Sequence, residues 1–405
     1  MEDKEERRYN VRVKIVVAVL VSSILTFCLT VIIYGHYLSK NGLIVNSYES
    51  SGEISDDLDL IKTYIDMNYK GEINDDNLKF GALKGYVDGL GDEYTELMDT
   101  REWGNMSTML TKTVGIGAYM IEPSDSDYVM IAGTVEDSPA EKAGLLLGDK
   151  IKEVNLEDVT GKGSEYVSNK IKNGDEGSWV KIKVLRDKEE IVFDIQRAKI
   201  NYYKIKHEMI ENNIGYIDFS SFTDTSYEEF KEAYEDLKNN GAKSLIIDLR
   251  SNTGGDVSQV LKIADMFVDS GKTIITVEDK DGNRVDSKST DEKVIDIPVV
   301  VLVNDYTASS SEILVGMLKD YGLAKIVGIK TFGKGVIQNV YQDVLGKKSG
   351  ITLKITVAEY FTPNGNKVQK KGIEPDVVVN GTAIEMQGVS RENDEQFKKA
   401  VELLK

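Results

Sequence analysis

Residues 299–321 read VVVLVNDYTASSSEILVGMLKDY, and this stretch decides the fold class. It begins with an uninterrupted run of five apolar residues, which is typical of a central strand covered on both faces. A short polar segment then leads into SEILVGMLKDY, whose apolar spacing predicts a helix. A buried strand that passes directly into a helix is the repeating unit of an α/β protein.

The sequence on both sides of this stretch repeats the alternation of strand and helix. The expected strands are GYIDF (215–219), SLIIDLR (244–250), KIVGIK (325–330) and ITLKITVAEYF (351–361), and the expected helices are YEEFKEAYEDLKN (227–239) and SQVLKIADMFV (258–268). We therefore predict one α/β core over residues 200–380. In such a core the loops that follow the strands carry the chemistry.

The turn after the apolar strand contains three consecutive serines, Ser309–Ser311. A serine at a strand-to-helix turn is exposed, and the N–H groups that begin the helix can stabilise a developing oxyanion, which suits a nucleophile. Ordinary capping of the helix by one of these serines, with Glu312 supporting the first turn, explains the same residues. Both interpretations stay open on this segment alone, and neighbouring serines can fill the two roles.

A lysine between two glycines, Lys334, is the second candidate for catalysis. The chain has only two histidines, His36 and His207, so a hydrolase here is expected to lack a catalytic histidine. Desolvation lowers the pKa of a lysine and lets it act as a base, although a Gly-Lys-Gly turn is more often a solvated loop. Gln338 follows four positions later, on the same side of a predicted strand, where its carbonyl could hold the amine.

Residues 111–199 have a different sequence pattern, which predicts several short strands and one short helix. The segment VGIGA at 114–118 is rich in glycine, and 137–151 read DSPAEKAGLLLGDKI. These two segments resemble a PDZ domain, which implies a loop that binds the carboxylate of a polypeptide tail. A plain connection between strands with no ligand explains the two glycines by themselves equally well. The expected binding residues are Val114, Gly115, Ile116, Gly117 and Ala118.

The segment TASSSEILVGMLKDYGLAKIVGIKTFGKGVIQ, residues 307–338, resembles the core of the carboxy-terminal processing proteases, also called tail-specific proteases. This resemblance implies a serine endopeptidase in which Ser309 is the nucleophile, Lys334 the general base and Gln338 the residue that orients the lysine. Thr307 and Ser310 depart from the usual Ser and Ala of the family, and both substitutes are small.

Three further segments carry the same resemblance. Residues 248–255, DLRSNTGG, are similar to the family loop that contributes a glycine N–H to the oxyanion hole. The expected donors are Gly254 or Gly255, with Gly254 placed first, together with the N–H of Ser310. The remaining matches are GDEYT at 91–95 and the segment from Tyr360 to Asp376.

Residues 15–34, IVVAVLVSSILTFCLTVIIY, are predicted to form a transmembrane helix, because about 20 uncharged residues cross a bilayer core. Arg7, Arg8, Arg12 and Lys14 precede them, so the N-terminus is expected in the cytoplasm and the bulk of the chain outside it, at the cell membrane. A cleaved signal peptide is the alternative, but the stretch is long for one and no small-residue cleavage site follows.

These observations predict an α/β fold class within an α+β multidomain chain, in which a PDZ-like β-rich domain precedes a core like those of crotonase and Clp protease. The order is a cytoplasmic tail (1–14), a transmembrane helix (15–34), a linker (35–56), an N-terminal helical region (57–110), a PDZ domain (111–199), the peptidase core (200–380) and a C-terminal helical tail (381–405).

Composition excludes several classes of function. The net charge of the 405 residues is −18, which argues against nucleic acid as a partner. A single cysteine, Cys28, and two widely spaced histidines exclude the common zinc motifs. No metal and no organic cofactor is expected.

The expected partners are polypeptide substrates with exposed C-termini. In some members of the resembled family a basic residue of the PDZ domain gates the active site, and Lys172 stands near that position, although a solvated lysine explains it better. A homodimer and a regulatory partner protein are compatible with the sequence. The alternative functions are a PDZ-bearing membrane scaffold without catalysis and a crotonase-type acyl-CoA enzyme; intact Ser309, Lys334 and Gln338 argue against the scaffold, and the extracytoplasmic location against the acyl-CoA enzyme.

Overall fold

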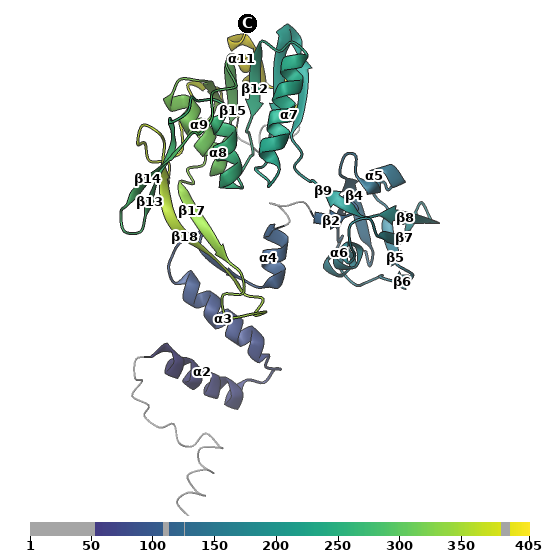
Figure 1. The fold of residues 1–405 in the computed structure, drawn as a ribbon. Helices are drawn as coiled ribbons and strands as arrows, with labels where there is room; N and C mark the ends of the chain where they lie inside the picture. The colour runs from purple at the N-terminus through teal and green to yellow at the C-terminus, as the bar shows by residue number, and fades with distance from the viewer. Residues whose placement is uncertain (1–52, 108–112, 125, 382–388) are drawn as a thin grey trace, which may run out of the picture. The chain divides into compact units, whose positions relative to one another are not determined.

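The structure is a computed structural model that describes residues 53–107, 113–124, 126–381 and 389–405 (Figure 1). The predicted cytoplasmic tail, the predicted transmembrane helix at 15–34 and most of the predicted linker lie outside these residues. Within the described ranges, no helix is long and apolar enough to cross a membrane. The chain divides into two compact units, Met1–Ala82 and Leu83–Lys405.

The N-terminal region forms two helices, α2 (Ile54–Asn68) and α3 (Asp75–Asp88). Neither helix has a buried residue. The apolar side chains of α2 repeat at helical spacing but remain exposed: Ile54, Leu58, Ile61, Tyr64 and Met67. An apolar helix face of this kind is usually covered by another surface.

The PDZ-like region is a small sheet with its own apolar core. Ser138 accepts a hydrogen bond from the N–H of Glu141, and Pro139 occupies the first turn, so the motif DSPAEKAG folds as a short capped helix. The sheet order is β3-β4-β5-β7-β8, with β6 beside β5. The elements are β2 (Thr113–Gly115), β3 (Ala118–Ile121), β4 (Val129–Thr134), α5 (Pro139–Ala143), β5 (Lys150–Val154), β6 (Glu157–Asp158), α6 (Ser164–Lys172), β7 (Trp179–Arg186), β8 (Glu189–Gln196) and β9 (Ala198–Ile200), which pairs with β2.

The core is a six-stranded sheet in the order β10-β11-β12-β15-β16-β19, parallel except for the edge strand β10. Its strands are β10 (Lys206–Ile210), β11 (Ile214–Asp218), β12 (Ser244–Asp248), β15 (Val299–Val303), β16 (Lys325–Gly328) and β19 (Val377–Val378), and the short helix η1 (Glu211–Asn213) separates the first two. The predicted apolar strand is fully buried as β15. The α/β prediction for this part of the chain is therefore confirmed.

Helices cover both faces of this sheet, as Figure 1 shows. On one face lie α7 (Ser226–Asn239), α8 (Val257–Asp265) and α9 (Ser310–Asp320), which share a core with alternate residues of β12 and β15. On the other face α11 (Glu395–Leu403) packs through Ala400 and Val401, preceded by the short helix η2 (Arg391–Asn393). A strand covered on both faces must be apolar throughout, which accounts for the sequence of β15.

A second, antiparallel sheet stands beside the core. Its longest strand, β18 (Thr352–Phe361), pairs with β13 (Thr273–Asp279), with β17 (Val336–Tyr341) and with β1 (Glu96–Met98), and β14 (Arg284–Lys288) completes it. The helix α4 (Thr100–Ser107) follows β1. In this sheet β1 pairs with a strand that lies far along the chain, since Glu96 is opposite Lys354.

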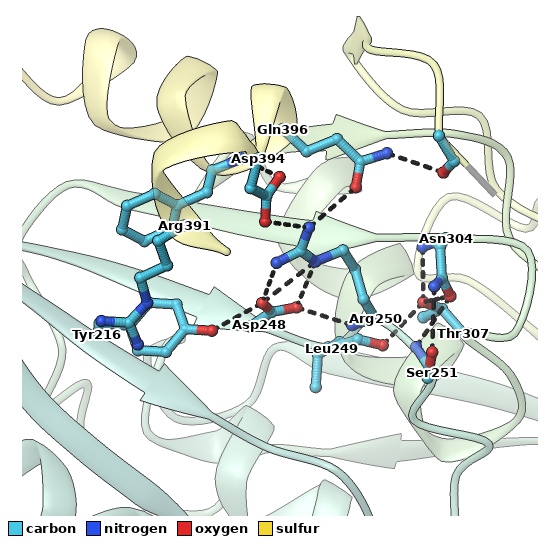
Figure 2. Close-up of polar contacts among 12 residues, drawn as sticks. Tyr216, Asp248, Leu249, Arg250, Ser251, Asn304, Thr307, Arg391, Asp394 and Gln396 are labelled. Carbon is cyan, nitrogen blue, oxygen red and sulfur yellow. Dashed lines mark hydrogen bonds and ion pairs between the residues drawn. The ribbon is translucent and has the colours of Figure 1, made fainter. Parts of the chain in front are cut away.

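The C-terminal helix is fastened to the loop after β12 by Arg250 (Figure 2). The guanidinium lies 2.6 Å from Asp248 and 2.7 Å from Asp394, with a further bond of 3.2 Å to Gln396. Asp394 also caps α11, because its other oxygen accepts from the N–H of Phe397 at 3.0 Å. Arg250 and both aspartates are largely buried, so this ion pair is shielded from water.

The first prediction concerns this fastening. We expect Asp394→Ala to lower the free energy of opening of α11 by about 2–3 kcal/mol, since it removes both a helix cap and a buried charge partner. Asp394→Asn should cost less, because asparagine also caps helices well. Hydrogen exchange of the α11 amides measures the effect, with the exposed Glu395→Ala as control. Unchanged exchange in Asp394→Ala would show that the ion pair does not hold the helix.

Candidate active site

Ser309 is held in an unusual backbone conformation between β15 and α9. Its φ of 55° and ψ of −118° lie in a region that residues with a side chain rarely adopt. Strain of this kind persists only where the surroundings impose it, and it gathers at functional sites. Ser309 is half-buried, whereas Ser310 and Ser311 are buried.

The two following serines use their hydroxyls to fix the turn. Ser310 Oγ donates to the carbonyl of Gly255 at 2.9 Å, and Ser311 Oγ donates to the carbonyl of Asn252 at 3.0 Å. These bonds join the start of α9 to the loop that follows β12, the neighbouring parallel strand. The hydroxyls of Ser310 and Ser311 are thus bonded to the neighbouring loop, whereas Ser309 is the N-cap residue of α9 and forms a capping box with Glu312. The helix cap and the candidate nucleophile are therefore the same serine.

Glycine is required in the loop beside Ser309. A Cβ on Gly254 would lie 2.8 Å from Ser309 Cβ, and one on Gly255 would lie 2.0 Å from the carbonyl oxygen of Phe222. Both glycines have positive φ values, 100° and 141°. The loop therefore approaches the serine more closely than any other residue type would allow.

The two glycine N–H groups differ in their partners. The N–H of Gly254 donates to Asn252 Oδ1 at 2.9 Å, inside the loop, and Asn252 is fully buried. Among the described residues, the N–H groups of Gly255 and Ser310 have no acceptor. A free N–H at a helix start, beside a second free N–H, is what an oxyanion needs.

Glu312 connects the serine turn to the lysine loop. One oxygen of its buried carboxylate accepts from the N–H of Ser309 at 3.0 Å and from the N–H of Lys334 at 2.8 Å. The other oxygen accepts from the N–H of Gly333 at 2.8 Å and from Thr331 Oγ1 at 2.5 Å. Burial raises the pKa of Glu312, and these four bonds oppose that shift.

A tyrosine joins the same two residues from the other direction. The hydroxyl of the buried Tyr360 lies 3.0 Å from the carbonyl oxygens of both Ser309 and Lys334. The backbones at positions 309 and 334 are thus held by two independent side chains, Glu312 and Tyr360. The turn and the loop, predicted separately from the sequence, form one site.

The amine of Lys334 lies in a setting that favours its neutral form. Burial lowers its pKa below the ordinary 10.5, nearby Lys354 lowers it further, and Glu312 acts in the opposite sense. None of the described acidic side chains forms an ion pair with Lys334. Its Nζ lies 5.1 Å from the ring centre of Tyr94.

Gln338 lies on β17, opposite Thr356 of β18. Its Nε2 donates to Thr356 Oγ1 at 3.3 Å. Lys334 lies two residues before β17 begins, so strand alternation alone does not fix which side of the sheet it shares with Gln338. The sequence analysis gave no role to four further residues of this site, which are Asn252, Tyr94, Thr356 and Tyr360. It expected Glu312 only to support the first turn of the helix. It gave the segment GDEYT only as a resemblance to the family.

Four of the five predicted tail-binding residues, Gly115, Ile116, Gly117 and Ala118, line a groove of about 540 Å³ beside β3 and α6, whereas Val114 is not among the residues that line it. Gly115, Ile116 and Ala118 line it on one side, and Ile171 and Lys172 on the other. Lys172 is the last residue of α6 and lines this groove. In the described part of the chain no cluster of His, Cys, Asp and Glu could hold a metal ion.

Comparison with known proteins identifies the two folded parts. Residues 213–379 match peptidase family S41, and residues 114–196 match the PDZ domain. The carboxy-terminal processing protease CtpA of Bacillus subtilis (strain 168) is 34% identical over 371 residues, which cover 90% of this chain and 77% of that protein. A probable CtpA-like serine protease of Staphylococcus aureus (strain bovine RF122 / ET3-1) is 31% identical over 369 residues, which cover 90% of this chain and 72% of that protein.

The fold is also that of a solved structure. A putative S41 protease from Bacteroides fragilis NCTC 9343 superposes with a TM-score of 0.52 at 16% identity, covering 89% of this chain and 99% of that one. The family resemblance seen in the sequence is confirmed by these matches. The chain belongs to the carboxy-terminal processing serine peptidases of family S41.

Proposed function

We propose that this peptidase is a membrane-anchored endopeptidase that acts outside the cytoplasm, with Ser309 as nucleophile and Lys334 as general base. One observation carries the Ser-Lys assignment: a single oxygen of Glu312 accepts from the backbone N–H groups of both residues. A nucleophile and its base must be held at fixed separation, and this carboxylate provides that constraint.

The reaction follows ordinary acyl transfer. The neutral amine of Lys334 takes the proton from Ser309 Oγ as the oxygen attacks the peptide carbonyl. The ammonium returns that proton to the leaving amine, and an acyl-enzyme ester remains. Lys334 then deprotonates the water that hydrolyses the ester. The N–H groups of Gly255 and Ser310, which have no acceptor among the described residues, are the proposed oxyanion donors; the bond from Gly254 to Asn252 argues against Gly254.

The PDZ groove is the proposed site for the tail of the substrate. Its glycine-rich segment and the edge of β3 suit an extended peptide that ends in a carboxylate. Lys172 lines this groove and adds a positive charge to it. If Lys172 gates the active site, it does so by binding the tail of the substrate in this groove.

The proposed anchor rests on residues 15–34 and the positive charges before them. We expect the full-length protein in the membrane fraction and its release when residues 1–37 are deleted; a soluble full-length protein would contradict the anchor.

The exposed apolar face of α2 supports a homodimer. Light scattering tests this proposal, because Ile61→Lys should then convert the dimer to a monomer. Regulation by a partner protein predicts low activity of the pure enzyme that rises when its partner is restored.

The second prediction tests the mechanism. Ser309→Ala and Lys334→Met should each abolish cleavage of an unfolded reporter such as casein. Because the base acts in its neutral form, kcat/KM of the wild type should rise with pH through a midpoint below 10.5, the ordinary pKa of lysine. Lys330→Met, which changes an exposed lysine four residues away, is the control. Undiminished cleavage by Ser309→Ala would reject Ser309 as nucleophile.

The third prediction concerns Glu312. Glu312→Gln keeps the volume but turns one acceptor oxygen into a donor that faces backbone N–H groups. We expect kcat to fall about 100-fold and the free energy of unfolding by about 2 kcal/mol. The exposed Glu374→Gln is a matched control that should change neither quantity. Wild-type kcat in Glu312→Gln would mean that the shared carboxylate does not set the geometry of the dyad.

The fourth prediction concerns the tail site. Cleavage of a peptide with a free C-terminus should exceed that of the same peptide with an amidated C-terminus, about tenfold in kcat/KM, because the carboxylate loses its charge-assisted bonds. Lys172→Ala should reduce this difference by about two- to threefold without changing cleavage of the amidated peptide. Equal cleavage of both peptides by the wild type would remove the groove from substrate selection.

A further inference from the structure

A turn from the start of the chain lies directly beside the dyad. Residues 91–95, GDEYT, precede β1, which is paired with β18. Thr95 Oγ1 accepts from the N–H of Thr356 at 3.0 Å, which fastens the turn to β18. Asp92 in turn accepts from Thr95 Oγ1 at 2.5 Å and from the N–H of Tyr94 at 3.1 Å. Residues about 260 positions apart in sequence are therefore held together next to Gln338.

Tyr94 covers the amine of Lys334. The Nζ lies 5.1 Å from the centre of the tyrosine ring, within the range of a cation–π contact. Burial and a hydrogen bond to Glu93 raise the pKa of Tyr94 to about 12. The phenol is thus neutral at pH values below about 12, and in that form it does not compete with Lys334 as a base.

A directed chain of hydrogen bonds orients the amide of Gln338. Burial opposes the charge of Asp92, but hydrogen bonds from Thr95, from Thr356 and from the N–H of Tyr94 outweigh it and hold its pKa below the ordinary value. As a carboxylate, Asp92 only accepts, so the hydroxyl hydrogen of Thr356 points toward it. Thr356 Oγ1 then accepts from Gln338 Nε2 at 3.3 Å. Among the described residues no donor bonds to the amide oxygen of Gln338, so this oxygen is available as an acceptor.

We infer that Tyr94 and Thr356 are positioning residues for the catalytic base: Tyr94 shields and then stabilises the amine of Lys334, and Thr356 holds the Gln338 amide with its oxygen ready to accept from that amine. This inference rests on the Ser-Lys mechanism proposed above. It gives the GDEYT segment a role in the chemistry.

The two residues act at different stages of the proton transfer. Before the reaction, the ring of Tyr94 keeps water from the amine and so favours its neutral form. Once Lys334 has taken the proton, the face of the ring and the oxygen of Gln338 stabilise the ammonium. The charged groups that act on Lys334 are Lys354 of β18, which is itself paired with Glu96, and Glu312 of α9, and none of the variants below changes them.

The experiment measures kcat/KM of the full chain against pH with an internally quenched peptide. In Tyr94→Ala, water reaches the amine, its neutral form becomes less favoured, and the acidic limb should move up by about one pH unit. Tyr94→Leu keeps an apolar side chain over the amine but lacks the aromatic ring. In this variant the acidic limb of the pH profile should not move to higher pH, while the plateau value of kcat/KM should fall about two- to fivefold. Tyr94→Phe should recover both features to within about threefold. Tyr86→Leu, at an exposed tyrosine of α3, is the control.

Thr356 is tested through Gln338. Thr356→Val removes the hydroxyl at constant shape and should lower the plateau about fivefold, and Thr356→Ser should restore it. Because Thr356 acts through the glutamine, Thr356→Val should have no further effect in a Gln338→Ala background. A structural role would instead give an additive loss.

The outcomes separate the two proposals. Activity of Ser309→Ala would defeat the Ser-Lys mechanism itself. If Ser309→Ala is inactive but Tyr94→Ala keeps the wild-type limb and plateau, or Thr356→Val and Gln338→Ala are additive, the mechanism stands and the positioning roles are rejected.

Discussion

The proposed active site depends on a buried carboxylate, that of Glu312. Removing a carboxylate from water is costly, and it is tolerated only when its oxygens are fully hydrogen-bonded. Here the four donors come from three positions of the lysine loop and from the strained serine. The place of Glu312 in the first turn of α9 also brings its charge to the positive end of the helix dipole. Because the buried charge needs all of these donors, it holds the backbones of Ser309 and Lys334 together and maintains the unfavourable φ of Ser309.

Local patterns predicted most of the core because they depend on neighbours in sequence. The apolar run of β15 and the helical spacing of α9 follow from burial on both faces and on one face, respectively. The placement of the predicted strand at 351–361 was different: as β18 it belongs to the antiparallel sheet, where it is partnered by β1 from the other end of the chain. Periodicity within a segment does not determine its distant partner, so the contribution of β1 to the site was not predictable.

The candidate site shows the same limit. Ser309 and Lys334 could be singled out from their turns, but Asn252 decides which glycine N–H is available, and only the folded loop shows that its side chain turns back to Gly254. Arg250 likewise belongs to the segment DLRSNTGG, whose sequence indicates only a loop of the family. In the structure its ion pair reaches Asp394, 144 positions away in sequence (Figure 2). The loop that carries Gly255, one of the two proposed oxyanion donors, is therefore stabilised from the far face of the sheet by the residues at the start of α11.

The proposed lysine base sets a stricter requirement than a histidine base would, and long-range contacts around Lys334 suit that requirement. Histidine is largely neutral near pH 7, whereas an ordinary lysine is protonated and cannot accept a proton. Its surroundings must disfavour the ammonium before the reaction without leaving it unsupported afterwards. A glycine-flanked loop buries the amine but offers no partner of its own. In the proposed mechanism, the aromatic ring of Tyr94 and the amide of Gln338 offer the amine an uncharged surface with partial negative charge. This surface suits both stages better than a carboxylate, since a carboxylate would hold the lysine protonated throughout. Under the proposed mechanism, β1 must therefore pair with β18 before the surroundings of Lys334 are complete.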